Sequence, residues 1–292
     1  MLFRSDLLSF AGGGNKVRKM QMIAAEARAE GADTLITCGG VQSNHARVTA
    51  GAGAALGLDV VLVLNPSTGS GQAVHPSAPT GNLRLDHLFG AEIRYVTDRA
   101  DRVPAMDAVA AQRRAAGRRP FVVPLGASTP AGAIGFARGV AEVLPAGVKP
   151  VAIVHASSSG GTQAGMIAGC ALLGLRARVI GISADADAAE LSDTVKALLT
   201  GVAARLGGST AAVGADRPIE VDDRFVGDGY GIPTEASTDA QSLLARTEGI
   251  VLDPVYTAKA MAGLLARIRD GEFAAGDTVL FWHTGGVPGY FA

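Results

Sequence analysis

Short apolar segments alternate with amphipathic helical segments along most of this chain, and this alternation limits the possible folds more than any other feature. The apolar segments are DTLITCGG, DVVLVLN, VAIVHAS, RVIGISA and TVLFWHTGG. Each is rich in Val, Ile or Leu at consecutive positions, as expected for strands that are buried on both faces. Such strands belong to parallel sheets covered by helices on both sides. The sequence therefore predicts a doubly wound α/β fold with open, twisted parallel sheets.

Helical segments lie between these strands. Apolar residues recur at helical spacing after Lys16, and Gly31 ends that helix. Further helices are predicted over 43–58, 102–116, 162–175, 188–206 and 257–269, and from Thr129 onward. Residues 207–233 are rich in glycine, proline and polar residues without a clear period, which predicts a loop over a site.

The composition excludes several classes of partner. The chain has 292 residues, of which 48% are hydrophobic, so it can bury a large core and is expected to form two lobes. Lys and Arg number 26 against 27 Asp and Glu, which gives no basic surface for nucleic acid or for a membrane. The opening MLFRSDLLSF has a charge pair where a signal peptide needs an apolar stretch, so we expect a cytoplasmic protein with a small-molecule partner.

The two cysteines, Cys38 and Cys170, are far apart and lie inside apolar segments. This placement argues against a disulfide framework and against a zinc site. We therefore expect both cysteines in the core and no metal centre.

Glycine-flanked polar residues follow the predicted strands in GGVQSN, SSSGGTQ and HTGG. The carboxyl ends of strands in open α/β sheets form the edge at which ligands bind. SSSGGTQAG, residues 157–165, ends a strand and opens a helix, so its backbone N–H groups can receive a phosphate at the positive end of the helix dipole. It matches neither the nucleotide loop GxxxxGKS nor GxGxxG, and an ordinary tight turn is the alternative.

Lys16 follows three glycines and Asn15 at the start of the first helix. Nearby cations and burial would lower the pKa of this lysine, and a neutral lysine is the nucleophile that forms Schiff bases. A solvent-facing lysine is the simpler alternative. A Schiff-base lysine together with a phosphate loop is the minimum set for binding pyridoxal phosphate, which favours the first reading.

GGVQSNH, residues 39–45, lies at another strand end before a helix. Either Ser43 or Asn44 fits the N-cap of that helix by residue type. The Asn44 amide could also bond a phenolate oxygen, and the Ser43 hydroxyl could take part in proton transfer.

Six motifs follow one another along the chain: GGNKVRK, GGVQSNHAR, SSSGGTQAGM, GYGIPTE, LDPVYTAKAM and HTGG. Together they resemble the family of 1-aminocyclopropane-1-carboxylate deaminases and D-cysteine desulfhydrases. The resemblance runs from about Arg4 to Phe291 and implies the two-domain fold of the tryptophan synthase β superfamily, fold type II of the pyridoxal-phosphate enzymes. It implies a large cofactor domain from residues 1–18 and 130–292, a small domain from 19–129, and a homodimer. Members of the family usually carry a further segment before the stretch that FRSDLL matches, so the chain is expected to begin later than its relatives.

The resemblance assigns roles to individual residues. Lys16 binds pyridoxal phosphate as a Schiff base, and Asn44 bonds the phenolic oxygen of the cofactor. Tyr256 flanks the pyridine ring and acts in catalysis with Lys16, Ser43 and Tyr230. The residues implied to hold the phosphate are Ser159, Gly160, Gly161 and Thr162. The residues implied to bind the substrate are Gln42, Ser43, Asn44 and Tyr230.

Two positions select a branch of the family. Deaminases carry Glu after the tyrosine of DPVY and Leu in HxGG, whereas this chain has Thr257 and Thr284, both of the desulfhydrase type and both expected to contact the cofactor. A hydroxyl next to the pyridine nitrogen gives a weaker electron sink than a carboxylate, and sulfide expulsion needs less activation than ring opening. The expected reaction is α,β-elimination on D-cysteine, which gives pyruvate, hydrogen sulfide and ammonia. Ring opening, an L-cysteate sulfo-lyase activity and a phosphate- or cofactor-binding protein without turnover remain as alternatives.

Other polar residues receive structural assignments. His45 and His283 lie next to motif glycines and are expected to be hydrogen-bonded structural histidines. Lys259 is expected to face solvent on the last helix. Arg18 and Lys19 are expected to pair with acids on the first helix, and a contribution of their charge near the phosphate is the alternative.

Overall fold

The computed structural model describes residues 2–7, 9–65 and 78–292, and it contains two parallel sheets among them. The four-stranded sheet has the order β4-β3-β2-β5, and the five-stranded sheet has the order β1-β9-β6-β7-β8. The strands are β1 (Leu2–Ser5), β2 (Thr34–Gly40), β3 (Asp59–Asn65), β4 (Glu92–Tyr95), β5 (Pro120–Val122), β6 (Ala152–Ser157), β7 (Arg178–Ser183), β8 (Glu220–Asp222) and β9 (Val279–His283). Every pairing between neighbouring strands is parallel.

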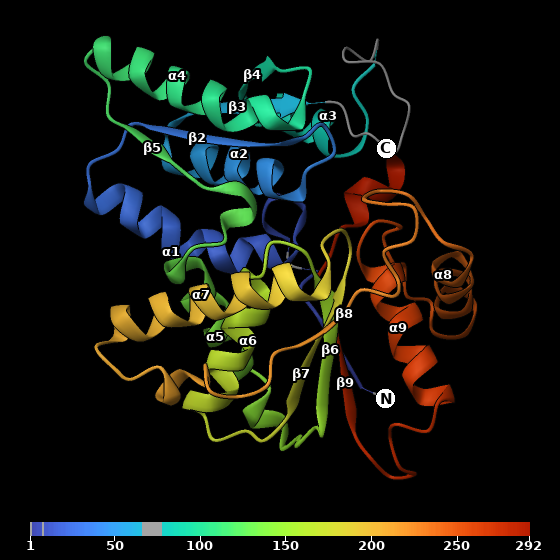
Figure 1. The fold of residues 1–292 in the computed structure, drawn as a ribbon. Helices are drawn as coiled ribbons and strands as arrows, with labels where there is room; N and C mark the ends of the chain where they lie inside the picture. Colours follow the sequence, from blue (N-terminus) through green and yellow to red (C-terminus); the bar gives the residue numbers. More distant parts are fainter. Residues whose placement is uncertain (1, 8, 66–77) are drawn as a thin grey trace.

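Helices cover both faces of each sheet (Figure 1). The α-helices are α1 (Asn15–Ala29), α2 (Asn44–Leu56), α3 (Gly81–Leu88), α4 (Arg102–Ala115), α5 (Pro130–Ala141), α6 (Gly161–Leu172), α7 (Ala188–Leu206), α8 (Glu235–Glu248) and α9 (Thr257–Arg269). In the four-stranded sheet α4 covers one face and α2 the other. In the five-stranded sheet α5, α6 and α7 cover one face, and α8 and α9 cover the other. The predicted α/β fold is confirmed.

The alternation of side chains along each strand explains why these strands are apolar throughout. In β2, Leu35 packs with α1 and α2, whereas its neighbour Ile36 packs with α4. In β6, Ile153 packs with α5 and α6, whereas Val154 packs with α9. Successive side chains point to opposite faces of a strand, so both faces need apolar residues when both are covered.

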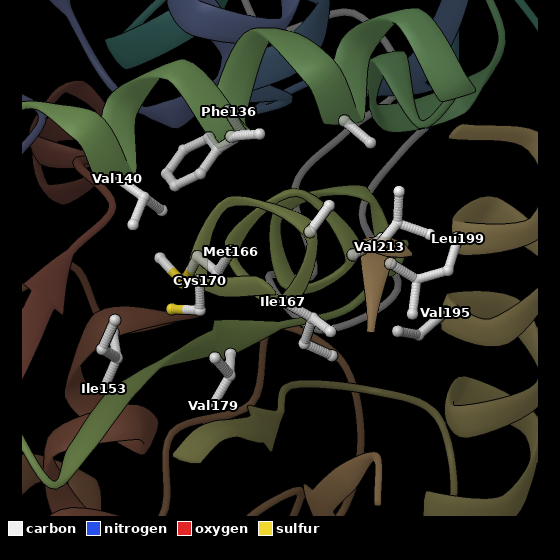
Figure 2. Packing of buried hydrophobic residues seen from close by; sticks show 14 of the residues in the cluster. Phe136, Val140, Ile153, Met166, Ile167, Cys170, Val179, Val195, Leu199 and Val213 are labelled. Carbon is white, nitrogen blue, oxygen red and sulfur yellow. The ribbon is translucent and has the colours of Figure 1, made fainter. Parts of the chain in front are cut away.

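The larger core lies under α5, α6 and α7 (Figure 2). Phe136 of α5 and Met166 and Cys170 of α6 point into it, together with Val195 of α7. Cys38 lies in the cluster beneath α4, so both cysteines are free and buried as predicted. Each buried side chain of this size contributes about 1.5–3 kcal/mol by burial.

Several elements differ from the sequence prediction. The predicted helix boundaries of α7 and α9 agree with the structure, but β1, β8 and α8 lie in segments for which no element was predicted. β1 is short and half exposed, and β8 lies inside the glycine-rich segment 207–233, so neither shows a clear apolar pattern. No helix in the described ranges is long and apolar enough to cross a bilayer. The domain boundaries at 18/19 and 129/130 stay a prediction.

Candidate active site

A cavity of about 700 Å³ lies where the carboxyl edges of the two sheets face each other. Its wall combines residues from the ends of β2 and β3 and from the segments after β4 and β5 with residues that follow β6, β7 and β9. The predicted site residues that line it are Lys16, Ser43, Asn44, Ser159, Gly160, Thr162, Tyr230, Tyr256 and Thr284. Six segments that are far apart in sequence therefore contribute side chains or backbone to one space.

Lys16 lies in the first turn of α1, and its Nζ is 3.3 Å from the carbonyl oxygen of Gly126. Gly14 precedes the helix at φ 101°, a conformation that disfavours any residue with a side chain. Gly14 N–H donates to Asp6, and Asn15 N–H donates to the Thr284 carbonyl, so this corner is fixed against the end of β9. Burial lowers the pKa of the Lys16 amine to about 8. A substantial fraction of neutral amine is therefore present near neutral pH.

Lys19 is completely buried one turn after Lys16. Its Nζ donates to the same Gly126 carbonyl at 3.2 Å and to Ser128 Oγ at 3.1 Å. Burial and the neighbouring ammonium of Lys16 hold the Lys19 pKa well below its usual value. The expectation that Lys19 pairs with acids on its own helix is wrong. Its spacing of three residues from Lys16, on one helix face, was the available signal.

Arg18 faces the opposite direction and also departs from the prediction. Its guanidinium pairs with Asp6 at 2.7 Å and with Glu142 at 2.6 Å, and neither acid lies on α1. Asp6 also accepts a hydrogen bond from Trp282 Nε1 at 2.9 Å. Arg18 therefore attaches α1 to β9 and α5 and stays outside the cavity wall.

The turn between β6 and α6 has the form of an anion site. Its N-cap residue, Gly160, has φ 72° and no side-chain cap, and of the first N–H groups of α6 that of Gly161 donates to the Ser159 carbonyl at 2.9 Å. A Cβ on Gly161 would lie 2.9 Å from Lys19 Nζ and 2.7 Å from Ser128 Oγ. Ser159 Oγ accepts from Ser128 at 2.8 Å, and Thr162 Oγ1 accepts from Asn15 at 2.8 Å. Lysine, hydroxyl groups and open backbone N–H groups thus converge at one corner, as a phosphate requires.

The turn between β2 and α2 is built differently. Ser43 is the N-cap of α2, and its Oγ accepts the Ala46 N–H at 3.2 Å. The oxygen of the Asn44 amide accepts from Arg47 at 3.3 Å and from Asn82 at 3.2 Å. With its oxygen held in this way, Asn44 presents its N–H groups to the cavity.

Arg47 is completely buried and holds this side of the site together. It donates to Asn82 Oδ1 at 2.6 Å, to the Gly13 carbonyl at 2.9 Å and to the Ala11 carbonyl. These bonds connect the loop before Lys16 with the start of α2. Sequence analysis did not single out this residue, because nothing in GGVQSNHAR distinguishes it from a solvent-facing helix arginine.

Tyr230 and Tyr256 meet in the cavity wall, where their hydroxyl groups share a hydrogen bond. Their rings are edge to face, with centroids 5.8 Å apart. Burial raises the pKa of both phenols, so both stay protonated at neutral pH. Buried Asp253 accepts the Tyr256 N–H at 2.8 Å, which fixes the start of α9 below the ring.

Lys259 is buried, which contradicts the expectation that it faces solvent. Its Nζ donates to the carbonyl oxygens of Val226 at 2.7 Å and Gly229 at 3.0 Å. Carbonyl groups of a turn can satisfy an ammonium without any carboxylate, and a helical pattern does not reveal this. Lys259 therefore holds the segment that carries Tyr230.

Three predicted residues do not line the cavity. Gln42 Oε1 accepts the Asn82 N–H at 2.9 Å and its Nε2 donates to Thr80, so the side chain faces α3. The Thr257 hydroxyl donates to Asp253 Oδ2 at 2.6 Å and accepts the Asp253 N–H at 2.8 Å. Gly161 lies behind the cavity wall at the first turn of α6. The roles of these residues toward cofactor and substrate stay predictions.

The two motif histidines have structural contacts. His45 Nε2 shares a hydrogen bond with Thr37 at 2.7 Å, and burial keeps the pKa of its ring well below the usual value. His283 Nε2 lies 2.9 Å from the Val251 carbonyl oxygen, and its Nδ1 accepts the Gly285 N–H. The ranges that the structure covers contain no group of histidine, cysteine and acidic residues suited to a metal.

Comparisons with known proteins agree with this geometry. The family model described as "Pyridoxal-phosphate dependent enzyme" matches residues 2–285, and the chain belongs to this family. It is 39% identical to the D-cysteine desulfhydrase of Klebsiella pneumoniae (strain 342) and 38% identical to that of Salmonella typhi. Both alignments cover 99% of this chain and 87% of the relative.

Solved structures show the same relationship. A crystal structure of an ACC deaminase homologue superimposes with a TM-score of 0.88 and 34% identity, covering 99% of this chain and 85% of that one. The structure of maize serine racemase has a TM-score of 0.65 at 17% identity, covers 97% of this chain and 82% of that one, and supports the fold alone. The cofactor is pyridoxal phosphate, and a half-buried amine in the same cavity as an uncapped helix end fits its aldehyde and its phosphate.

Proposed function

We propose that the protein is a lyase that catalyses α,β-elimination on a small amino acid, with D-cysteine as substrate. One water and one D-cysteine then give pyruvate, hydrogen sulfide and ammonia. The observation that carries the proposal is that the Lys16 amine and the uncapped end of α6 face the same cavity. The full-length similarity to D-cysteine desulfhydrases supports the choice of substrate.

Lys16 is the residue proposed to bond to the cofactor. Its lowered pKa supports this role, because only the neutral amine can attack an aldehyde. The cofactor supplies an electron sink for the charge that develops at the substrate Cα. Asn44, whose N–H groups face the cavity, would bond the phenolic oxygen of the ring.

The phosphate would be held through hydroxyl and backbone N–H groups of Ser159, Gly160, Gly161 and Thr162. Lys19 would add a positive charge at the same corner, since its Nζ lies beside Gly161. Each hydrogen bond to a charged group is worth about 1.5–3 kcal/mol.

For removal of the Cα proton we propose Lys16 rather than Ser43 as the base. Ser43 Oγ accepts the Ala46 N–H, and no hydrogen bond from Ser43 to a basic side chain is found in the part of the chain that is described. Burial lowers the pKa of the Lys16 amine to about 8, which suits proton transfer near neutral pH. The protonated phenols of Tyr230 and Tyr256 would orient the substrate from the other side.

Cyclopropane ring opening is the second candidate, and the likeness to the ACC deaminase homologue favours it. Thr257 and Thr284 count against it, because neither supplies the carboxylate that a stronger electron sink requires. Thr284 lines the cavity, and the Thr257 hydroxyl is taken up by Asp253.

We also propose that the enzyme works in the cytoplasm as a homodimer. Two free, buried cysteines suit a reducing compartment. The family resemblance supports the dimer, and sedimentation equilibrium of the purified enzyme measures it directly.

The test combines a chemical label with a substrate panel. Borohydride treatment of the cofactor-loaded enzyme is expected to bleach its yellow colour and to leave the pyridoxyl label on Lys16. Lys16→Ala is expected to abolish keto-acid production, whereas the exposed control Lys196→Ala keeps it.

The substrate panel is D-cysteine, L-cysteine, L-cysteate, β-chloro-D-alanine and aminocyclopropane carboxylate, assayed for keto acid and ammonia. A label on another lysine, or no keto acid from any substrate, would overturn the proposal.

A further inference from the structure

Arg102 is a buried cation in the cavity wall that the proposed reaction does not yet use. It is the first residue of α4, its exposed fraction is 9%, and it lines the same cavity as Lys16 and Tyr256. Its Nε donates to Asn65 Oδ1 at 2.6 Å, and Nη2 donates to the same oxygen. Asn65, the last residue of β3, therefore fixes the direction of the guanidinium.

The charge of Arg102 has no carboxylate partner among the residues that the structure describes. Burial alone makes an unpaired guanidinium costly. Its position at the N-terminus of α4 adds a cost, because the helix dipole is positive there. The neighbouring Arg99 adds repulsion, and burial together with this charge lowers the pKa of Arg102. A cation held at such cost in a ligand cavity requires an anion that arrives with the ligand.

The carboxylates in the cavity wall are not suited to neutralise it. They are Asp185, which follows β7, and Glu190, which lies in the first turn of α7. Asp185 forms its ion pair with Arg99, at 3.6 Å, and none with Arg102. Glu190 is exposed to solvent. Arg102 is left as the cation available to a ligand on this wall.

The position of Arg102 indicates which anion it receives. The proposed function puts the cofactor phosphate at the corner at α6, and the residues predicted to bind the substrate at the other turn are Ser43 and Asn44 at the start of α2. Arg102 lies at the end of the neighbouring strand β3, within electrostatic range of the Tyr230 and Tyr256 phenols. It is thus a third, separate location for negative charge in the same cavity.

We propose that Arg102 binds the substituent on the substrate Cβ and that this substituent is an anionic sulfur group, a sulfonate or a thiolate. The inference rests on the proposed elimination and narrows its substrate class. When the C–S bond breaks, its electron pair goes to sulfur. A sulfonate then departs as sulfite, and a thiolate departs as hydrosulfide when its sulfur receives a proton from the Tyr230 phenol in the same cavity wall. A fixed guanidinium stabilises that charge as it develops.

The first experiment measures binding without turnover. Calorimetry of the cofactor-loaded enzyme compares 3-sulfopropanoate, which has a carboxylate and a sulfonate, with propanoate, which has the carboxylate alone. We expect the wild type to bind 3-sulfopropanoate at least ~10-fold more tightly, as one charge-assisted hydrogen-bond pair allows. Arg102→Met is expected to remove this preference and Arg102→Lys to keep part of it. No preference in the wild type, or an unchanged preference in Arg102→Met, overturns the inference.

Two further variants separate charge from structure. Asn65→Asp puts a carboxylate against the guanidinium without removing it, so it should also lower the preference for 3-sulfopropanoate. Arg94→Met removes a partly exposed arginine of β4 that pairs with Glu92 outside the cavity wall, and it is expected to leave the preference unchanged. If Asn65→Asp keeps the full preference, the charge of Arg102 is not what the ligand contacts.

Kinetics distinguish this inference from the proposed function. The ratio of kcat/KM for D-cysteine to that for β-chloro-D-alanine, whose substituent is uncharged, should fall in Arg102→Met. An equal loss for both substrates would assign Arg102 to the α-carboxylate and overturn the inference while the elimination stands. An inactive wild type would overturn the proposed elimination, and the calorimetric preference would still decide the role of Arg102.

Discussion

The two strand-to-helix turns that face each other across the cavity share a plan but differ in how the helix begins. Ser43 caps α2 with its hydroxyl, so the N-terminus of that helix has a partner within the chain. Gly160 begins α6 at φ 72° and offers no cap. A side-chain cap satisfies N–H groups at the start of a helix and stabilises it, so these groups no longer attract an anion. An uncapped start leaves its N–H groups able to bind an anionic ligand.

The cations beside the two turns differ in the same way. Arg47, next to the capped turn, uses its guanidinium on the carbonyl groups of Ala11 and Gly13 and on the Asn82 amide. Lys19, next to the uncapped turn, donates to the Gly126 carbonyl and to Ser128 Oγ and has no carboxylate partner among the residues that the structure describes. The turn after β2 therefore positions side chains, and the turn after β6 is the one that we propose for the phosphate.

The largest effect is expected from filling the uncapped turn. In Gly161→Ala the new methyl group would lie 2.7 Å from Ser128 Oγ and 2.9 Å from Lys19 Nζ. Displacing these groups should cost the cofactor about 3 kcal/mol of affinity, a loss of more than a hundredfold. Fluorescence titration of the apoenzyme with pyridoxal phosphate measures this loss.

Gly208→Ala is the matched control, because Gly208 has space for a Cβ and lies outside the cavity wall. It should bind the cofactor as the wild type does. An unchanged cofactor affinity in Gly161→Ala would mean that the phosphate does not occupy the corner at α6.

Replacing Lys19 by Met should have the next largest effect. The substitution keeps most of the side-chain volume and removes the ammonium, so the phosphate loses one charge-assisted bond worth about 1.5–3 kcal/mol, or 10- to 100-fold in affinity. The borohydride label should still appear on Lys16 at saturating cofactor, since the Lys16 amine is retained. A variant that binds cofactor normally would show that Lys19 serves only the carbonyl of Gly126.

The sequence predicted the uncapped turn better than it predicted the cations. SSSGGTQAG has its glycines between an apolar strand and a helix, and this local pattern is enough to indicate backbone N–H groups free for an anion. The burial of Lys19 and Lys259 depends on packing between elements that are distant in sequence. Lys259 contacts the carbonyl groups of Val226 and Gly229, about thirty residues earlier, and no helical period carries that information.

Arg102 illustrates the same limit at the cavity wall. The role proposed for Arg102 follows from its hydrogen bond to Asn65, from the absence of an acid partner in the described part of the chain and from its place in the cavity wall. In the sequence it is one arginine among several at the start of a helix. Local sequence patterns indicate where a strand ends. The tertiary structure decides which side chains line a cavity between two sheets.

The pH dependence of cofactor incorporation should follow the Lys16 amine. Its pKa is lowered to about 8, and only the neutral form attacks, so the rate should rise as pH increases and level off above this value. Between about pH 7 and pH 8 the neutral fraction of such a group grows about fivefold. Stopped-flow absorbance of apoenzyme mixed with pyridoxal phosphate checks the sign. A rate that falls over this range would contradict a lysine nucleophile with a lowered pKa.

The smallest effect on cofactor binding is expected at the capped turn, where Ser43→Ala and Ser43→Asn separate capping from chemistry. Alanine removes the acceptor for the Ala46 N–H and should lower the free energy of unfolding by about 1 kcal/mol, whereas asparagine keeps a cap and costs only a few tenths. Both variants should bind the cofactor within about threefold of the wild type, a difference of about 0.7 kcal/mol or less. Urea unfolding and cofactor titration measure the two quantities.

Because Lys16 is the proposed base, Ser43→Asn should also keep most of its turnover, and a loss of turnover with normal cofactor affinity would return that role to Ser43. A loss of cofactor affinity as large as that of Gly161→Ala would show that both turns bind the phosphate and that the contrast between them does not hold.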